Sequence, residues 1–147
     1  MYVSHCVVMR KLVYLILLLL VFACSKIEHK QKMLEGNWKL NVVRIEDGEG
    51  FLFFDSLATG SFSLDAAKIS GKANYTYSYF GQYDVSDSVV FNQSSCALSA
   101  NGEQLLIARD TDTLQAKIIV LTKKHLTFEY YDYLQYRLKR FSCTRIL

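Results

Sequence analysis

The chain has 147 residues, of which 51% are hydrophobic, 21% charged and 14% aromatic, and it contains no proline. This composition suffices for one folded domain and excludes a disordered or collagen-like chain. The formal net charge is +3, and Arg10 and Lys11 are the only charged residues among the first 23, so the remainder is nearly neutral. A nucleic-acid-binding protein would carry a larger basic excess.

The N-terminal segment has the charge and hydropathy order of a secretory signal. Arg10 and Lys11 precede an unbroken apolar run over residues 12–23, which ends at Cys24. At ~1.5 Å per residue, a helix over this run reaches only ~18 Å, short of a hydrocarbon core of ~30 Å. We therefore predict a cleaved signal peptide over residues 1–23. A start at Met9 instead of Met1 would give this signal a compact form.

The next segment, residues 24–33, is short and polar and shows no apolar periodicity. Such a composition predicts a flexible tether between the signal and the folded part of the chain. We expect the folded domain to occupy residues 34–147.

From residue 37 onward, apolar and polar residues alternate with a period of two, as in strands with one buried face. The clearest run is 73–80, in which Tyr75, Tyr77 and Tyr79 share a face. The candidate strands are residues 37–46, 51–54, 62–69, 73–80, 89–92, 95–98, 103–109, 113–121, 125–131 and 134–141. This series predicts an all-β antiparallel barrel or sandwich.

The last candidate strand, residues 134–141, has one apolar and one polar face. The apolar set is Leu134, Tyr136 and Leu138, and the polar set is Gln135, Arg137 and Lys139. A sheet with one solvated face would place the apolar set inside and the polar set outside.

The end of the apolar run, Val21-Phe22-Ala23-Cys24, resembles the lipobox of bacterial lipoproteins. The resemblance implies that Cys24 is acylated and becomes the first residue of the mature chain. Several buried acyl chains would hold the protein firmly at a membrane. The implied location is the bacterial outer membrane, with a domain that faces the periplasm by default and the cell surface as the alternative.

The segment Leu34-Glu35-Gly36-Asn37-Trp38 resembles the Gly-x-Trp opening of lipocalin and calycin barrels, and the overall plan resembles small lipocalin-like lipoproteins of Bacteroidetes. The resemblance implies an up-and-down β-barrel of about eight strands. It also implies that Trp38 closes the barrel floor beneath a basic residue from near the end of the chain. The candidates for this residue are Arg137, Lys139 and Arg140, with Arg137 and Arg140 assigned to the floor motif.

Two functions remain open for such a barrel. The leading one is binding of a small hydrophobic or amphipathic molecule inside the barrel. The residues expected to line that site are aromatic: Tyr75, Tyr77, Tyr79, Phe128, Tyr130 and Tyr136. The alternative is a structural or interaction lipoprotein whose aromatic residues fill the core and whose surface binds a partner protein of the cell envelope.

Two cysteines fall in the expected domain, Cys96 and Cys143. Export to an oxidising compartment and the lipocalin resemblance make a disulfide between them one of two open alternatives. Two buried free thiols are the alternative.

The sequence lacks the patterns of catalytic and metal sites. Asp110-Thr111-Asp112 lacks the glycine and the distal glutamate of a calcium loop. His125 has no nucleophile signature nearby. We therefore predict a non-enzymatic protein without metal or cofactor.

Overall fold

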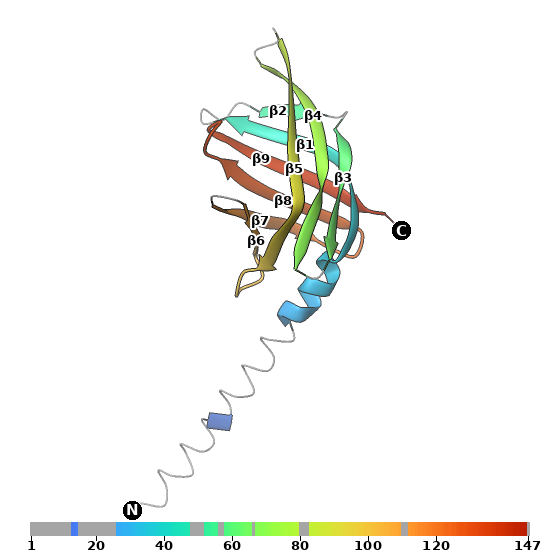
Figure 1. Cartoon of the computed structure of the whole chain (residues 1–147), viewed down its shortest axis with the longest axis vertical. Coiled ribbons are helices and arrows are strands. Elements are labelled where there is room, and N and C mark those ends of the chain that lie inside the picture. Colours follow the sequence, from blue (N-terminus) through green and yellow to red (C-terminus); the bar gives the residue numbers. More distant parts are fainter. Residues whose placement is uncertain are drawn as a thin grey trace, which may run out of the picture.

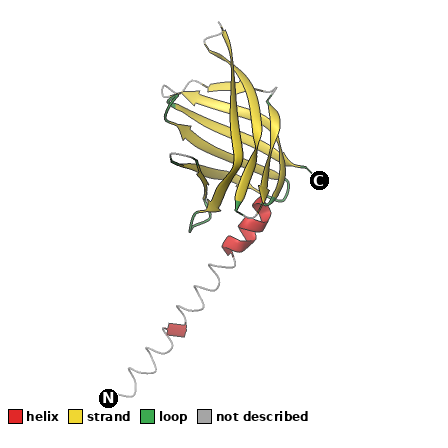
Figure 2. Cartoon of the chain, viewed as in Figure 1, coloured by secondary structure: helices red, strands yellow, loops and turns green. Residues whose placement is uncertain are grey.

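The computed structural model describes residues 13–14, 26–47, 52–55, 58–65, 67–79, 83–109 and 112–146. Strands dominate this part of the chain, where they form one nine-stranded sheet (Figures 1 and 2). They are β1 (Gly36–Asp47), β2 (Leu52–Asp55), β3 (Thr59–Asp65), β4 (Lys68–Tyr79), β5 (Tyr83–Leu98), β6 (Gln104–Ala108), β7 (Thr113–Leu121), β8 (His125–Asp132) and β9 (Arg137–Arg145).

The sheet closes on itself because the first strand pairs with the last. β1 pairs with β9 on one edge, and on its other edge it pairs with β3 near its start and with β2 near its end. β2 and β3 therefore share one position of an eight-strand barrel. All neighbouring strands are antiparallel, and consecutive strands from β3 to β9 are neighbours. The prediction of an antiparallel up-and-down barrel of about eight strands is confirmed.

One predicted strand is in fact the corner of a hairpin. Residues 62–69 were expected to form a single strand, but β3 ends within them and β4 begins, with Asp65 paired to Lys68. Apolar residues fall at positions 62, 64, 66, 67 and 69, so a phase change of one residue is the only sign of the turn in the pattern.

Two other segments that were predicted as separate strands belong to a single strand. Residues 89–92 and 95–98 both belong to β5, which continues through Gln93. Gln93 has a φ of 52°, and the register of β5 against β4 shifts across this region. Such a bulge bends the strand and interrupts its period of two without ending it.

The predicted tether is largely helical. Residues 26–34 form a helix directly before β1, at the end of the barrel where β1 begins (Figure 1). Leu34 is buried, and the Lys30 Nζ donates a hydrogen bond of 2.9 Å to the carbonyl oxygen of Gly102. The expectation of a flexible segment was wrong here because tertiary contacts hold a helix that has little apolar periodicity of its own.

The predicted signal peptide lies outside the described residues, except for Val13 and Tyr14. Met9 and Cys24 also lie outside them. Within the described ranges, no helix combines the length and the apolar character needed to cross a membrane.

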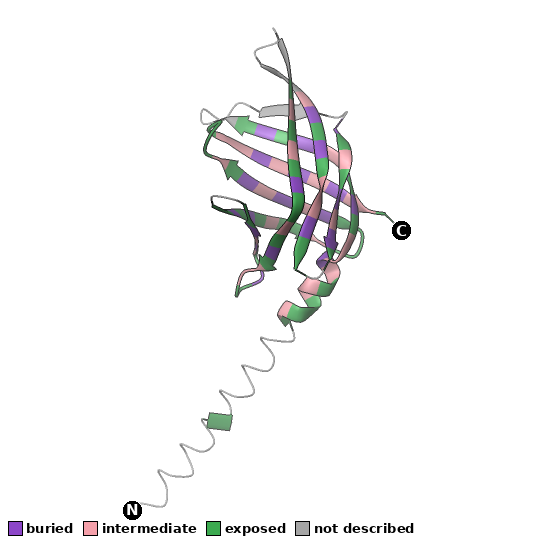
Figure 3. Cartoon of the chain, in the orientation of Figure 1, coloured by how far each residue is buried: buried purple, intermediate pink, exposed green. Residues whose placement is uncertain are grey.

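The core lies inside the barrel, where buried and exposed residues alternate along the strands (Figure 3). The largest fully buried side chains are Trp38, Phe62, Phe128 and Phe141. Aromatic residues from different strands thus meet in the interior.

The predicted orientation of the last strand is wrong. Lys139 lies inside the barrel and is only 2% exposed, whereas Leu134 and Tyr136 are 93% and 71% exposed. The turn over residues 133–136 separates these two residues from β9, so the period of two does not continue across it.

Candidate functional site

The structure separates the aromatic residues that were expected to line a ligand site. Tyr75, Phe128 and Tyr130 are buried inside the barrel, but Tyr136 lies exposed in the turn between β8 and β9. Tyr77 and Tyr79 lie on β4, outside the residues whose side chains are described.

Aromatic rings from β3, β4, β8 and β9 pack against one another in the interior. The ring centroids of Phe128 and Phe141 are 5.3 Å apart and nearly parallel, and those of Tyr130 and Phe141 are 5.7 Å apart. Phe62 meets Phe141 edge to face at 6.2 Å, and Tyr75 does so at 6.0 Å. These are the separations of aromatic pairs in contact, so Phe141 is surrounded by rings.

Trp38 forms the floor of the barrel with the helix that precedes it. Its ring is fully buried, and its Nε1 donates a hydrogen bond of 2.8 Å to the carbonyl oxygen of Leu34. The guanidinium of Arg145 lies 4.6 Å from the centre of the Trp38 ring, within the range of a cation–π contact. It also donates hydrogen bonds to the carbonyl oxygens of Met33 and Glu35. Trp38 thus contacts both the helix that precedes β1 and the last residue of β9.

The cation over Trp38 is Arg145, not Arg137 or Arg140 as expected. Pairing of β1 with β9 places Arg145 opposite Trp38, whereas Arg137 pairs with Asp47 at the far end of β1. Arg140 instead forms an ion pair with Glu129 of the neighbouring strand β8. A strand register decides which of several basic residues reaches the floor, and the sequence does not specify that register.

Gly36 has a structural reason to be glycine. Its φ is +132°, a conformation that other residues rarely adopt, and a Cβ there would lie 2.8 Å from Nη1 of Arg145. Glycine at this position therefore leaves room for the guanidinium that covers the Trp38 ring.

A buried ion cluster lies toward the other end of the barrel. The Nζ of Lys139 lies 2.9 Å from Oδ2 of Asp87 and 2.8 Å from Oδ2 of Asp132. The Tyr75 hydroxyl donates a hydrogen bond of 2.8 Å to Asp87. Two carboxylates and one ammonium leave the cluster with one net negative charge. Their mutual pairing is what allows an ammonium group to be buried.

The cluster shifts the acidity of its members. Burial by itself raises the pKa of the Asp87 and Asp132 carboxyls, but the hydrogen bond and the charge of Lys139 outweigh burial and hold both pKa values below 3.8. Burial raises the pKa of the Tyr130 hydroxyl, and the charges of Asp132 and Asp87 raise it further. Both carboxylates are therefore ionised and Tyr130 is neutral at ordinary pH.

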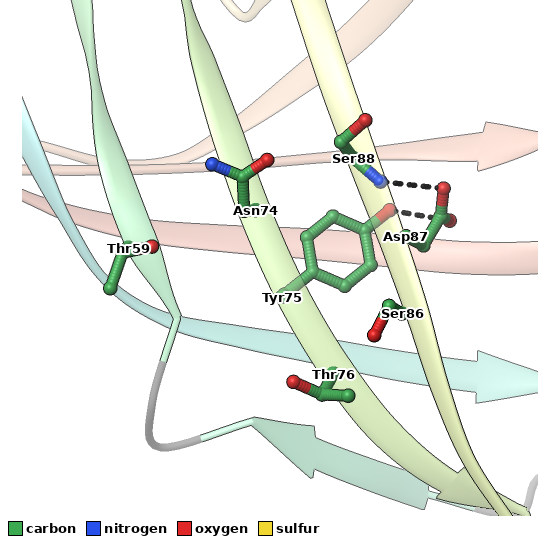
Figure 4. Close-up of a pocket in the computed structure, with 7 residues that line it drawn as sticks. All are labelled: Thr59, Asn74, Tyr75, Thr76, Ser86, Asp87 and Ser88. Carbon is green, nitrogen blue, oxygen red and sulfur yellow. Dashed lines mark hydrogen bonds between the residues drawn. The ribbon is translucent and has the colours of Figure 1, made fainter.

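A pocket of about 400 Å³ lies beside this cluster, across strands β3, β4 and β5, and Figure 4 draws the residues that line it. The hydroxyl of Tyr75 points toward Asp87 on the neighbouring strand. The other lining residues carry short hydroxyl or amide groups: Thr59, Asn74, Thr76, Ser86 and Ser88. The pocket is open and polar, unlike the enclosed apolar cavity expected for a ligand inside the barrel.

The turn between β8 and β9 presents large side chains to solvent. Tyr133 is 77% exposed, and Leu134 and Tyr136 are also largely exposed. Asp132 fixes this turn, because its Oδ1 accepts hydrogen bonds from the backbone N–H groups of Leu134 and Gln135. Since Oδ2 of Asp132 binds Lys139, the exposed turn is joined directly to the buried cluster.

The two cysteines do not form the expected disulfide. Cys96 and Cys143 are both free and buried. Burial raises the pKa of the Cys96 thiol and raises that of Cys143 to about 12, so both are neutral thiols. Inert buried thiols of this kind pack as small apolar side chains.

The described ranges contain no group of three or more His, Cys, Asp or Glu side chains arranged to hold a metal ion. Asp110 and Thr111, part of the rejected calcium-loop pattern, lie outside those ranges, and Asp112 forms an ion pair with Arg109. His125 is exposed at the start of β8.

Comparisons with known proteins identify no family. No protein-family profile matches the chain, and no curated protein matches it. Among solved structures, a redesigned beta barrel is similar over 80% of this chain and 95% of its own length, at 9% sequence identity and a TM-score of 0.33. A likeness of this degree supports no argument about function.

The ion cluster is the feature that the sequence analysis missed. Its members come from three strands, with Asp87 on β5, Asp132 on β8 and Lys139 on β9. One signal was present: Asp84 aside, Asp87 is the only charged residue in the long stretch from residue 73 to residue 102. An isolated charge within an alternating strand can mark an inward position with a partner elsewhere.

Proposed function

We propose that this chain is a lipid-anchored protein of the bacterial outer membrane, of the lipocalin-like lipoprotein type. In this proposal its barrel is a filled scaffold that holds a partner protein through its surface. The proposal gives the chain no catalytic role and no cofactor.

The observation that carries the proposal is the packing of aromatic rings in the barrel interior. Phe141 has ring neighbours on several sides, at centroid distances of 5.3 to 6.2 Å. A small apolar ligand would have to displace rings that are 0 to 6% exposed. Displacing packed core side chains costs several kcal/mol, which favours a surface function.

The turn between β8 and β9 is the surface best suited to a partner. Leu134 and Tyr136 stand in solvent on a turn that hydrogen bonds from Asp132 hold in place. Exposed apolar and aromatic side chains on a rigid support resemble the anchor residues of protein interfaces, since little conformational entropy is lost when they bind.

The position of this turn agrees with an anchor at Cys24. The helix over residues 26–34 meets the barrel where β1 begins, and the turn adjoins Arg137, which pairs with Asp47 where β1 ends. A lipid attached just before the helix would leave the turn directed away from the membrane surface (Figure 1).

Native mass spectrometry of the protein purified from its host membranes tests the anchor and the filled interior together. We expect the mass of residues 24–147 plus acyl chains and no further small molecule. The Cys24→Ser variant should lack the acyl mass. An apolar molecule that leaves only on unfolding would contradict the filled scaffold, and the unprocessed mass of the full chain would contradict the anchor.

Cross-linking in intact cells tests the partner. A photoreactive amino acid at Leu134 should give one discrete adduct with another protein. The same group at Lys124, an exposed residue near the opposite end of β8, serves as the control and should give none. Absence of an adduct at Leu134, or equal adducts at both positions, would contradict a partner at this turn.

A further inference from the structure

We infer that a pocket on the outer face of β6, β7 and β8 binds a neutral saccharide. The pocket has a volume of about 280 Å³, and its lining includes Thr113 and Gln115 of β7 and Tyr131 and Tyr133 at the end of β8. This volume is close to the lower end for small-molecule sites and suits one or two sugar rings. The inference goes beyond the proposed function and does not depend on it.

Two tyrosines form the aromatic side of the pocket. The rings of Tyr131 and Tyr133 meet edge to face with centroids 4.9 Å apart. Tyr131 is 37% exposed and Tyr133 is 77% exposed, so ring surface remains open to solvent. The C–H groups on one face of a pyranose are apolar and pack on such a ring, whose hydroxyl can still bind water or a sugar hydroxyl.

Uncharged polar side chains of β7 also line the pocket. Thr113 and Gln115 lie on the exposed face of β7, and neither side chain makes a hydrogen bond with any other residue that the structure describes. A hydroxyl and a primary amide both donate and accept hydrogen bonds. Sugar hydroxyls also do both, so neighbouring hydroxyls of a sugar match this pair without any need for charge.

Most of the charged groups around the pocket are paired with one another. Arg109 is paired with Asp112, with its Nε 2.7 Å from Oδ1 of that carboxylate. This pairing neutralises both groups at one edge of the pocket. Lys117 is the remaining cation in the lining, and it lies opposite Glu129 in the pairing of β7 with β8. Glu129 in turn forms an ion pair with Arg140. A neutral ligand would leave each of these ion pairs intact.

Isothermal titration of the full chain tests this site. The protein is held in a zwitterionic detergent, because this detergent has no sugar headgroup. The probes are maltotetraose, cellotetraose, the tetramer of N-acetylglucosamine and mannotetraose. We expect at least one to bind, and we expect Tyr133→Ala and Gln115→Ala each to weaken binding about tenfold, as loss of one stacking or polar contact does.

Tyr136→Ala is the matched control, because Tyr136 is an exposed tyrosine of the same turn that does not line the pocket. Its affinity should stay within about twofold of the native protein, well below the tenfold that 1.4 kcal/mol represents. The inference is overturned if none of the four saccharides binds, or if Tyr136→Ala weakens binding as much as Tyr133→Ala. It is also overturned if only the anionic probe polygalacturonate binds and salt abolishes that binding.

Discussion

A cation from β9 lies toward each end of the barrel, but the groups that hold the two cations differ. At the floor, Arg145 lies over the Trp38 ring and donates to the carbonyl oxygens of Met33 and Glu35. Toward the other end, Lys139 lies between two carboxylates. The floor cation is held by uncharged groups and the other by ionised ones.

This difference determines which end of the barrel is sensitive to pH. Backbone carbonyls and an indole ring do not titrate, and a guanidinium stays protonated at any ordinary pH. The carboxylates of the Lys139 cluster do titrate, and their removal leaves a buried ammonium without counter-charge. The floor should therefore be insensitive to pH, whereas the Lys139 end should weaken in acid.

The largest effect is expected at the floor. Trp38→Ala should lower the free energy of unfolding by about 4 to 5 kcal/mol, since it removes a fully buried ring, its hydrogen bond to Leu34 and the support of Arg145. Urea unfolding followed by circular dichroism measures this. Tyr133→Ala removes an exposed aromatic residue and serves as the control. A loss below ~1 kcal/mol for Trp38→Ala would show that Trp38 does not close the floor.

The next effect is expected at the buried cluster. Lys139→Met keeps a chain of similar length but leaves Asp87 and Asp132 facing each other without a cation, so we expect a loss of about 3 kcal/mol. The matched control is Arg140→Met, the next residue on the strand, which removes a cation that is 35% exposed and leaves one carboxylate, not two, without a partner. It should cost clearly less than Lys139→Met. Equal losses in the two variants would contradict a buried, structural role for Lys139.

The cluster also predicts how stability changes in acid. Both carboxyls have a pKa below 3.8 in the folded protein. Their contribution is therefore complete above the ordinary carboxyl pKa and is lost as pH falls below 3.8 through the lowered values. Urea midpoints measured from pH 6 to pH 2.5 should fall in this window. The fall should be much smaller in Lys139→Met, and an unchanged fall in that variant would assign the acid sensitivity to other groups.

A smaller loss of stability is expected for a substitution at Gly36, beside the floor. Gly36→Ala should cost about 1 to 3 kcal/mol, because alanine is strained at a φ of +132° and its Cβ would crowd Arg145. Combining it with Arg145→Ala separates the two causes in a double-mutant cycle. If the crowding matters, the glycine substitution costs less when the guanidinium is absent. Purely additive losses would leave backbone strain as the sole cause.

The smallest change in stability is expected for an exposed ion pair that belongs neither to the floor nor to the Lys139 cluster. Arg109 and Asp112 are 45% and 51% exposed, and their pair should contribute only ~0 to 0.5 kcal/mol. Thermal melts of Arg109→Ala should match the native protein closely. A large loss would show that exposure is not what separates this pair from the pairs of Lys139.

Much of the architecture was readable in the sequence. Alternation with a period of two over most of the chain after residue 37 indicated antiparallel strands, and the closed barrel of eight strand positions agrees with it. The alternation that begins at Trp38 marked the first strand, and the resemblance of Gly36 and Trp38 to the lipocalin motif implied the floor. These features are local, since a short stretch of chain sets both strand period and the conformational need for glycine.

Other features depended on contacts between distant segments. The period of two says which residues share a face of a strand, but not which face is inside. Leu134 and Tyr136 were expected inside and Lys139 outside, and the structure reverses both. A lysine can be buried only because Asp87, 52 positions away, and Asp132 supply its counter-charges.

By itself, the sequence therefore determined that the chain forms strands with one apolar face and that these strands pair antiparallel. The tertiary structure alone decided which basic residue covers Trp38, which charges enter the barrel and which aromatic residues remain in solvent. The physical reason is that strand register and burial of charge depend on pairing partners far along the chain.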